Sequence, residues 1–170
     1  MADNILLIGF MGVGKGRTAR ALAEQTGRFT VDTDDLIESM TKMKIRQIFA
    51  EQGEAHFRQL EQRAADWLEH HVSGTVVSAG GGFFMVKNMQ RLGKVVFLHS
   101  PLEAILAALR RQPDAEAKMK KRPLLQDLDQ AERLFTERLP LYRRVADMEI
   151  AVQGRENADI AAEIAFRLRG

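Results

Sequence analysis

The chain has 170 residues, of which 45% are hydrophobic and 28% charged, and its 25 basic residues nearly balance 23 acidic ones. This length suits one domain with a substantial core, and a net charge of only +2 argues against nucleic-acid binding. The absence of cysteine excludes disulfides and thiol chemistry. No stretch reaches transmembrane length and no basic segment precedes the first apolar run, so we expect a cytoplasmic protein without membrane contact.

A glycine-rich loop follows the first predicted strand. Ile5–Ile8 is a continuous apolar run typical of a strand buried on both faces of a parallel sheet, and a helical pattern extends from Lys15 towards Gly27. Between them, Gly9–Lys15 matches a phosphate-binding loop, whose backbone N–H groups and helix end surround an anion. We therefore predict an ATP or GTP site, rather than a chance match in a βα turn. The predicted nucleotide-binding residues in this segment are Gly12, Val13, Gly14, Lys15, Gly16, Arg17 and Thr18.

Gly16 departs from the nucleotide-binding pattern, which has Ser or Thr after the lysine. The hydroxyl normally found there is a magnesium ligand. We predict that water takes its place, at a cost of about 1–3 kcal/mol, because Thr18 would offer a hydroxyl only if the helix began later.

Further apolar runs alternate with helical patterns. Strands are predicted at 29–32, 75–79, 95–98 and 148–152, which favours an α/β fold with a parallel sheet. Ser100 is predicted to cap a helix that has Pro101 at its first position, and the last helix is predicted from about Asn157. Trp67 lies in line with apolar residues at helical spacing, which predicts a core position rather than a ligand-stacking one.

Acidic residues follow the second predicted strand, at the end of the sheet where open α/β folds bind ligands. In Asp32–Asp35, one carboxylate could hold magnesium waters while another orients or deprotonates an acceptor hydroxyl. The alternative is a helix cap, which Asp35 would suit best.

Three further features suggest ligand contacts. Gly80–Gly82 follows a buried strand, where a ligand can touch bare backbone. Arg58 offers a fork suited to a carboxylate, although pairing with Glu54 or Glu61 explains it equally well. A basic run ends at Arg122, which could reach transferring phosphates. Arg138 precedes a proline that we expect to end its helix, and a structural ion pair would also explain this arginine.

The order of these features resembles the shikimate kinases along nearly the whole chain. The set comprises the phosphate-binding loop, Asp32-x-Asp34, Gly53-Glu54-x-x-Phe57-Arg58, Gly80-Gly81-Gly82, Arg122-Pro123-Leu124-Leu125, Arg138 and Leu141-Tyr142. The resemblance implies a single domain over 1–170 with the three-layer α/β sandwich of P-loop kinases and a central parallel sheet of about five strands. It also implies a substrate-binding region of helices at about 33–62 and a mobile lid at about 112–127.

By this resemblance, the protein transfers the ATP γ-phosphate to the 3-hydroxyl of shikimate, in the chorismate branch of aromatic amino-acid synthesis. Its partners would be the small molecules shikimate and ATP with Mg²⁺, and we expect a monomer. On the phosphate side, the resemblance implies that Lys15 and Arg122 stabilise the transferring group and that Asp32 lies near magnesium, through water.

On the acceptor side, the resemblance implies that Asp34 binds shikimate hydroxyls and acts as base. Arg58 and Arg138 would hold the shikimate carboxylate, and the ring would rest on the backbone of Gly80, Gly81 and Gly82.

The nucleotide side departs from the family a second time. An arginine that lines adenine in many members falls on Ala108, and Arg110 or Arg111 is the candidate replacement. Two alternatives therefore stand beside an active shikimate kinase: a catalytically weak or silent relative that binds or regulates, and a kinase of the same fold for another small hydroxy acid such as gluconate.

Overall fold

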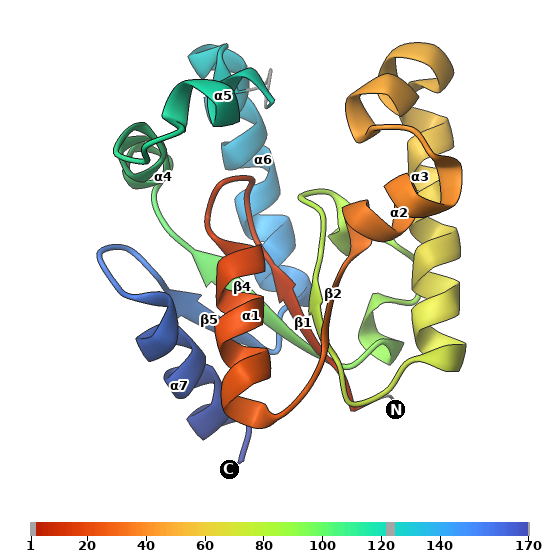
Figure 1. Cartoon of the computed structure of the whole chain (residues 1–170), viewed down its shortest axis with the longest axis vertical. Helices are drawn as coiled ribbons and strands as arrows, with labels where there is room; N and C mark the ends of the chain where they lie inside the picture. Colours follow the sequence, from red (N-terminus) through yellow and green to blue (C-terminus); the bar gives the residue numbers. More distant parts are fainter. Residues whose placement is uncertain (1–2, 122–124, 170) are drawn as a thin grey trace.

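The computed structural model describes residues 3–121 and 125–169. Within them, five parallel strands form one sheet in the order β2-β3-β1-β4-β5 (Figure 1). The strands are β1 Ile5–Ile8, β2 Thr30–Asp32, β3 Val76–Ser78, β4 Lys94–His99 and β5 Met148–Ala151. The predicted strands and the α/β class are confirmed. Arg122, predicted to contact the phosphates, lies outside the described residues.

Helices cover both faces of the sheet. They are α1 Lys15–Thr26, α2 Thr33–Thr41, α3 Ile45–His71, α4 Leu102–Arg110, α5 Ala115–Lys120, α6 Leu128–Val145 and α7 Asn157–Arg167. Successive side chains of β1 alternate between two cores: Leu6 and Ile8 pack with α3, α4 and α6, whereas Ile5 and Leu7 pack with α1 and α7. Both faces of the sheet are therefore buried, which explains why β1 is apolar without interruption.

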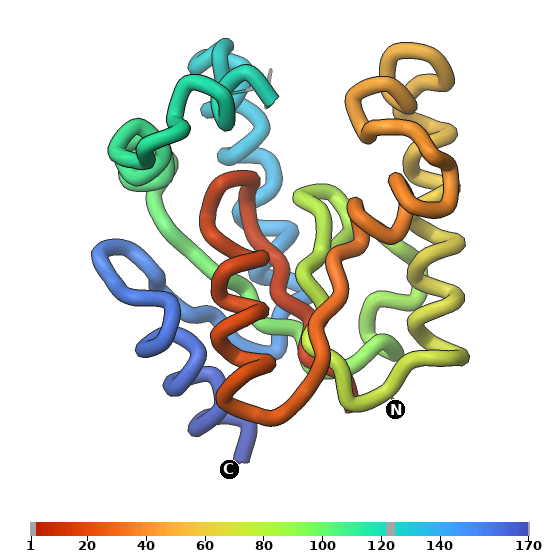
Figure 2. Tube along the Cα trace, viewed as in Figure 1, coloured from red at the N-terminus to blue at the C-terminus, as the bar shows by residue number. Residues whose placement is uncertain are grey.

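The carboxyl ends of the strands lie at one edge of the molecule. There the loop between β1 and α1 stands between two raised parts, α4 with α5 on one side and α2 with the first turns of α3 on the other (Figure 2). α3 is interrupted at Gly53, whose φ of 82° and ψ of 168° are not helical. Ligand contacts are expected at this edge of an open parallel sheet.

Two helix starts differ from the sequence-based expectation. Pro101 rather than Ser100 caps α4, because Pro101 is extended with ψ at 145° and the first helical residue is Leu102. At α2, Asp32 rather than Asp35 is the cap, since its carboxylate accepts the N–H groups of Asp34 and Asp35. The helix thus begins at Thr33, earlier than a cap at Asp35 would place it, and Asp34 and Asp35 belong to its first turn.

Two side chains also lie elsewhere than predicted. Trp67 is 43% exposed, because the buried stripe of α3 runs through residues such as Ala65 and Leu68. Pro140 does not end its helix, since α6 continues through it to Val145. Among the described residues, no helix is long and apolar enough to cross a membrane.

Candidate active site

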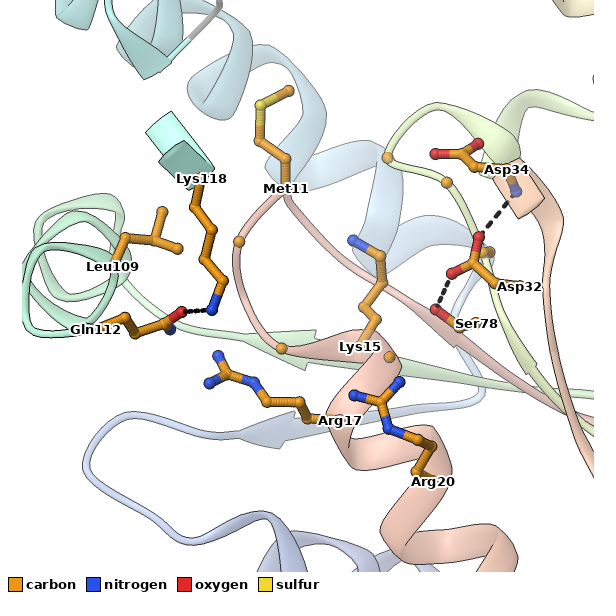
Figure 3. Close-up of a pocket in the computed structure, with 16 residues that line it drawn as sticks. Met11, Lys15, Arg17, Arg20, Asp32, Asp34, Ser78, Leu109, Gln112 and Lys118 are labelled. Atoms are coloured by element: carbon orange, nitrogen blue, oxygen red, sulfur yellow. Dashed lines mark hydrogen bonds between the residues drawn. The ribbon is translucent and has the colours of Figure 1, made fainter. Parts of the chain in front are cut away.

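A cavity of about 390 Å³ opens at the carboxyl ends of the strands (Figure 3). Four segments line it: the loop and start of α1, the acidic turn after β2, the glycine turn after β3, and the region from α4 to α5. The cavity unites the following predicted site residues: Gly12, Gly14, Lys15, Gly16, Arg17, Asp32, Asp34, Gly80 and Gly81. Val13 lines a second cavity instead, and Thr18 lines neither.

Backbone conformation shapes the phosphate-binding loop. Gly12 and Gly14 have φ of 83° and 100°, which side-chain-bearing residues rarely adopt. Gly14 caps α1 without a side chain, so no side-chain acceptor from the cap residue engages the N–H groups of the first turn. The Lys15 ammonium lies over the loop and donates to the carbonyl oxygens of Gly9 and Phe10, at 2.7 and 3.1 Å.

Thr18 does not present its hydroxyl to the loop. Its backbone N–H donates to the Gly14 carbonyl at 2.9 Å, so the helix has already begun. The side chain is buried, and its hydroxyl lies 3.4 Å from the Asn157 amide oxygen on α7. The Thr18 hydroxyl is therefore turned away from the place that a hydroxyl on residue 16 would occupy.

The Asp32 carboxylate is held on both of its oxygens. Oδ1 accepts the N–H groups of Asp34 and Asp35, and Oδ2 accepts the Ser78 hydroxyl at 2.8 Å. Ser78, at the end of β3, was not singled out by sequence reasoning, because one serine in an apolar strand carries no distinctive pattern. Asp32 thus caps α2 and also faces the cavity.

Asp34 is the most perturbed acid facing this cavity. Burial raises the pKa of its carboxyl to about 7, the negative charges of Asp32 and Glu61 add to this, and Lys15 opposes it. The Asp34 Oδ1 atom is buried without a hydrogen-bond partner among the described residues. It also lies only 2.6 Å from where a Cβ on Gly80 would stand, so the glycine leaves room for the carboxylate.

Two arginines flank the other glycines of the turn. Arg58 donates to Glu61 at 2.6 Å and to Glu54 at 3.0 Å, and its guanidinium lies where a Cβ on Gly82 would overlap it. Arg138 approaches the neighbouring glycine, with Nη1 3.3 Å from where a Cβ on Gly81 would stand. The predicted pairing of Arg58 with Glu54 and Glu61 is thus present, and the same side chain also borders the turn.

Tyr142 fixes the turn from behind. Its hydroxyl donates to the Gly81 carbonyl at 2.6 Å, and its ring packs on Phe97 and Phe84 with centroids 5.1 and 4.8 Å apart. Burial raises the pKa of the Tyr142 hydroxyl to about 12, so the group remains a donor at neutral pH. The sequence offers Tyr142 only as part of a motif, and its hydrogen bond depends on the packing of α6.

A second cavity of about 790 Å³ adjoins the loop on its other side, between α4 and the turn before α7. Ala108 and Arg111 both line it. Arg110 is not among its lining residues. Of the two candidate replacements, Arg111 therefore lines the same cavity as Ala108 and Arg110 does not.

A glycine loop between β1 and α1, at the carboxyl end of a parallel sheet of this order, defines the class of P-loop kinases. The sequence model of the family described as shikimate kinase matches residues 11–169. The chain belongs to the shikimate kinase family, whose members are ATP-dependent kinases.

Individual relatives agree with this assignment. The shikimate kinase of Dehalococcoides mccartyi is 37% identical over 172 residues, which cover 98% of this chain and 94% of that protein. The shikimate kinase of Helicobacter hepaticus is 37% identical over 142 residues, covering 84% and 82%. Among solved structures, shikimate kinase from Acinetobacter baumannii in complex with shikimate has a TM-score of 0.85 and 34% identity, covering 99% of this chain and 94% of that one.

Proposed function

We propose that this chain transfers the γ-phosphate of ATP to the 3-hydroxyl of shikimate, giving shikimate 3-phosphate for aromatic amino-acid synthesis. The main support is the convergence of an aspartate and two arginines on one glycine turn. Asp34, Gly80 and Gly81 share a cavity with the phosphate-binding loop, whereas Arg58 and Arg138 border the turn outside the lining of that cavity. Membership in the family and likeness to a structure in complex with shikimate support the same substrate. ATP is the phosphate donor of the family.

The acceptor is held by groups of complementary charge and shape. Arg58 and Arg138, which border Gly82 and Gly81, bind the shikimate carboxylate through their planar donor forks. The ring rests on Gly80–Gly82, whose lack of side chains allows close approach. Asp34 accepts hydrogen bonds from the shikimate hydroxyls and takes the proton of the attacking one, for which a pKa of about 7 is well matched.

The phosphates are held by the loop and by cations. The N–H groups at the start of α1 cradle them, and Lys15 moves from its carbonyl partners to the β- and γ-phosphates. Arg122 is proposed by family position to neutralise the transferring group. Gly12, Val13, Gly14, Gly16 and Arg17 border the nucleotide.

The donor groups fit a magnesium ion that arrives with the nucleotide, rather than one held by a protein cage. The described residues hold no group of three or more Asp, Glu, His or Cys side chains placed to bind a metal. Asp32 faces the cavity and retains lone pairs beyond the donors it accepts, so it would hold the ion through water. When bound, Mg²⁺ would neutralise phosphate charge.

We further propose that the chain acts as one domain and as a monomer in the cytoplasm, since one chain supplies the whole cavity. In this proposal, residues 33–62 form the substrate-binding region and residues 112–127 form the lid. Gly16 also favours a second candidate, a weak or silent relative that binds shikimate without efficient transfer.

One assay separates these functions: phosphorylation of shikimate and of gluconate by ATP, each across a magnesium titration. We expect rapid turnover of shikimate and none of gluconate, because gluconate has no ring to rest on the glycine turn. Turnover of gluconate alone would indicate the other kinase activity. Shikimate binding without phosphorylation at saturating magnesium would indicate the silent relative.

A further inference from the structure

Gly16 and Arg20 lie on the same face of α1, one turn apart. Helical side chains lean towards the N-terminus, so the side chain at 20 covers the surface above residue 16. Arg20 Nη1 is 3.7 Å from where a Cβ on Gly16 would stand, and both residues line the first cavity. Figure 3 shows the Arg20 guanidinium directed towards the cavity, whereas Arg17 extends to the side of Gln112.

The Arg20 guanidinium has no acceptor in the described part of the chain. Within 3–121 and 125–169, it forms neither a hydrogen bond nor an ion pair. The same is true of Arg17 and Arg63, whereas Arg58 and Arg91 are paired with Glu61 and Glu69. Asp32 is the nearby acid, but its carboxylate is engaged by Ser78 and by the start of α2. A cation without an acceptor beside a phosphate-binding loop is suited to an anionic ligand.

We propose that Arg20 binds the ATP phosphates. Its positive charge neutralises part of the phosphate charge, which a magnesium ion would neutralise if residue 16 carried a metal-binding hydroxyl. The inference rests on the proposed function and adds a residue to its nucleotide site. A guanidinium suits this role, because it stays charged and its donors match pairs of phosphate oxygens. ATP binding by this chain should therefore persist without divalent metal, and that part of the affinity should depend on Arg20.

The first test measures the ATP dissociation constant by calorimetry, in excess EDTA and again at saturating magnesium. Arg20→Gln should weaken metal-free binding about tenfold or more, the size of one or two charged hydrogen bonds, and weaken binding with magnesium much less. Arg20→Lys, which keeps the charge but loses the fork, should fall between. Arg63→Gln is the matched control, since Arg63 is exposed on α3 without a partner among the described residues, and both its constants should equal those of the unchanged protein.

The second test restores the hydroxyl. Gly16→Ser is sterically permitted, since the nearest atoms to its Cβ would be Arg20 Nη1 at 3.7 Å and Ser78 Oγ at 4.0 Å. Gly16→Ser should increase the ratio of the ATP affinity with magnesium to the ATP affinity without metal. An unchanged ratio would contradict the inference that Arg20 compensates for the missing hydroxyl.

Equal loss in both conditions, or no loss, for a folded Arg20→Gln protein would overturn the inference while leaving the proposed function intact. Absence of ATP binding by the unchanged protein in both conditions would instead overturn the proposed function, and this inference with it. Thermal unfolding of each variant establishes that it is folded.

Discussion

The acceptor side and the nucleotide side of the cavity differ in how their charges are balanced. On the acceptor side, Arg58 is paired with Glu54 and Glu61, and the turn it borders is tied to Tyr142. On the nucleotide side, Arg17 and Arg20 have no partner within the described part of the chain. The Arg58 charge is thus paired before any ligand binds, although Arg58 Nε and Glu61 Oε1 are buried without a hydrogen-bond partner among the described residues. The nucleotide side instead presents positive charge that a triphosphate would balance.

This difference indicates where ligand binding should reorganise the protein. A network that is already paired holds its geometry at little cost when substrate arrives. Unpaired cations repel one another until an anion arrives, so the nucleotide side should gain order and stability on ATP binding. Substitutions on the two sides should therefore change different constants.

The largest effect is expected at Lys15. Lys15→Met should lower the rate of phosphoryl transfer by about 10²–10³-fold, because it removes a preorganised cation from the charge that develops on the phosphates. Shikimate binding measured by calorimetry should change little, which would separate the two sides. Lys87→Met, at an exposed position away from the cavity, is the control and should change neither quantity. A loss of shikimate affinity in Lys15→Met as large as its loss of rate would contradict the separation of the two sides.

The next largest effect is expected at the glycine turn. In Gly82→Ala, the new Cβ would stand 2.7 Å from the Arg58 Cζ, so the guanidinium must move, and the KM for shikimate should rise about 10–100-fold. The KM for ATP should stay nearly constant. Gly81→Ala meets Arg138 only at 3.3 Å and should have a smaller effect, and steady-state kinetics that reverse this order would mean that Arg58 does not hold the carboxylate.

The pH dependence tests Asp34. Its pKa, raised by burial to about 7, predicts that kcat/KM for shikimate falls about tenfold per pH unit below 7 and is level above it. The fold favours the protonated Asp34 carboxyl over the charged one. The stability that this preference contributes is fully present below the unfolded-state pKa near 3.8 and is lost as the pH rises through the folded-state pKa of about 7.

Asp34→Asn should therefore be inactive, yet more stable than the unchanged protein at pH 8, as measured by thermal unfolding. If Asp34→Asn is less stable than the unchanged protein at pH 8, the buried Asp34 carboxylate does not destabilise the fold.

The smallest effect is expected at Arg17. Because it is an exposed cation, Arg17→Gln should raise the KM for ATP only about 2–5-fold and leave the KM for shikimate unchanged. Steady-state kinetics at low and high salt provide the measurement, since the difference between the proteins should shrink as salt screens the charge. A difference that persists at high salt would indicate a close, desolvated contact instead.

Local patterns in the sequence were sufficient for the strands, for the phosphate-binding loop and for the acidic and glycine turns. The continuous apolar run of β1 and the glycines with positive φ report backbone requirements that few other residues meet. Helix starts were predicted less well, because the choice between Asp32 and Asp35 as cap depends on where the chain leaves β2. Trp67 was misplaced because helical spacing does not fix the direction in which a helix faces its core.

By itself, the sequence determined the α/β class and the family and predicted the residues of both sides, because glycines, acids and arginines at fixed spacings carry that information locally. Only the tertiary structure decided which of them meet. It joined Asp32 to Ser78, pointed Arg58 at Gly82 while pairing it with Glu61, turned Thr18 towards α7, and set Arg20 over Gly16. These contacts join segments far apart in the chain or depend on side-chain direction, and neither is written in the spacing of residues along the sequence.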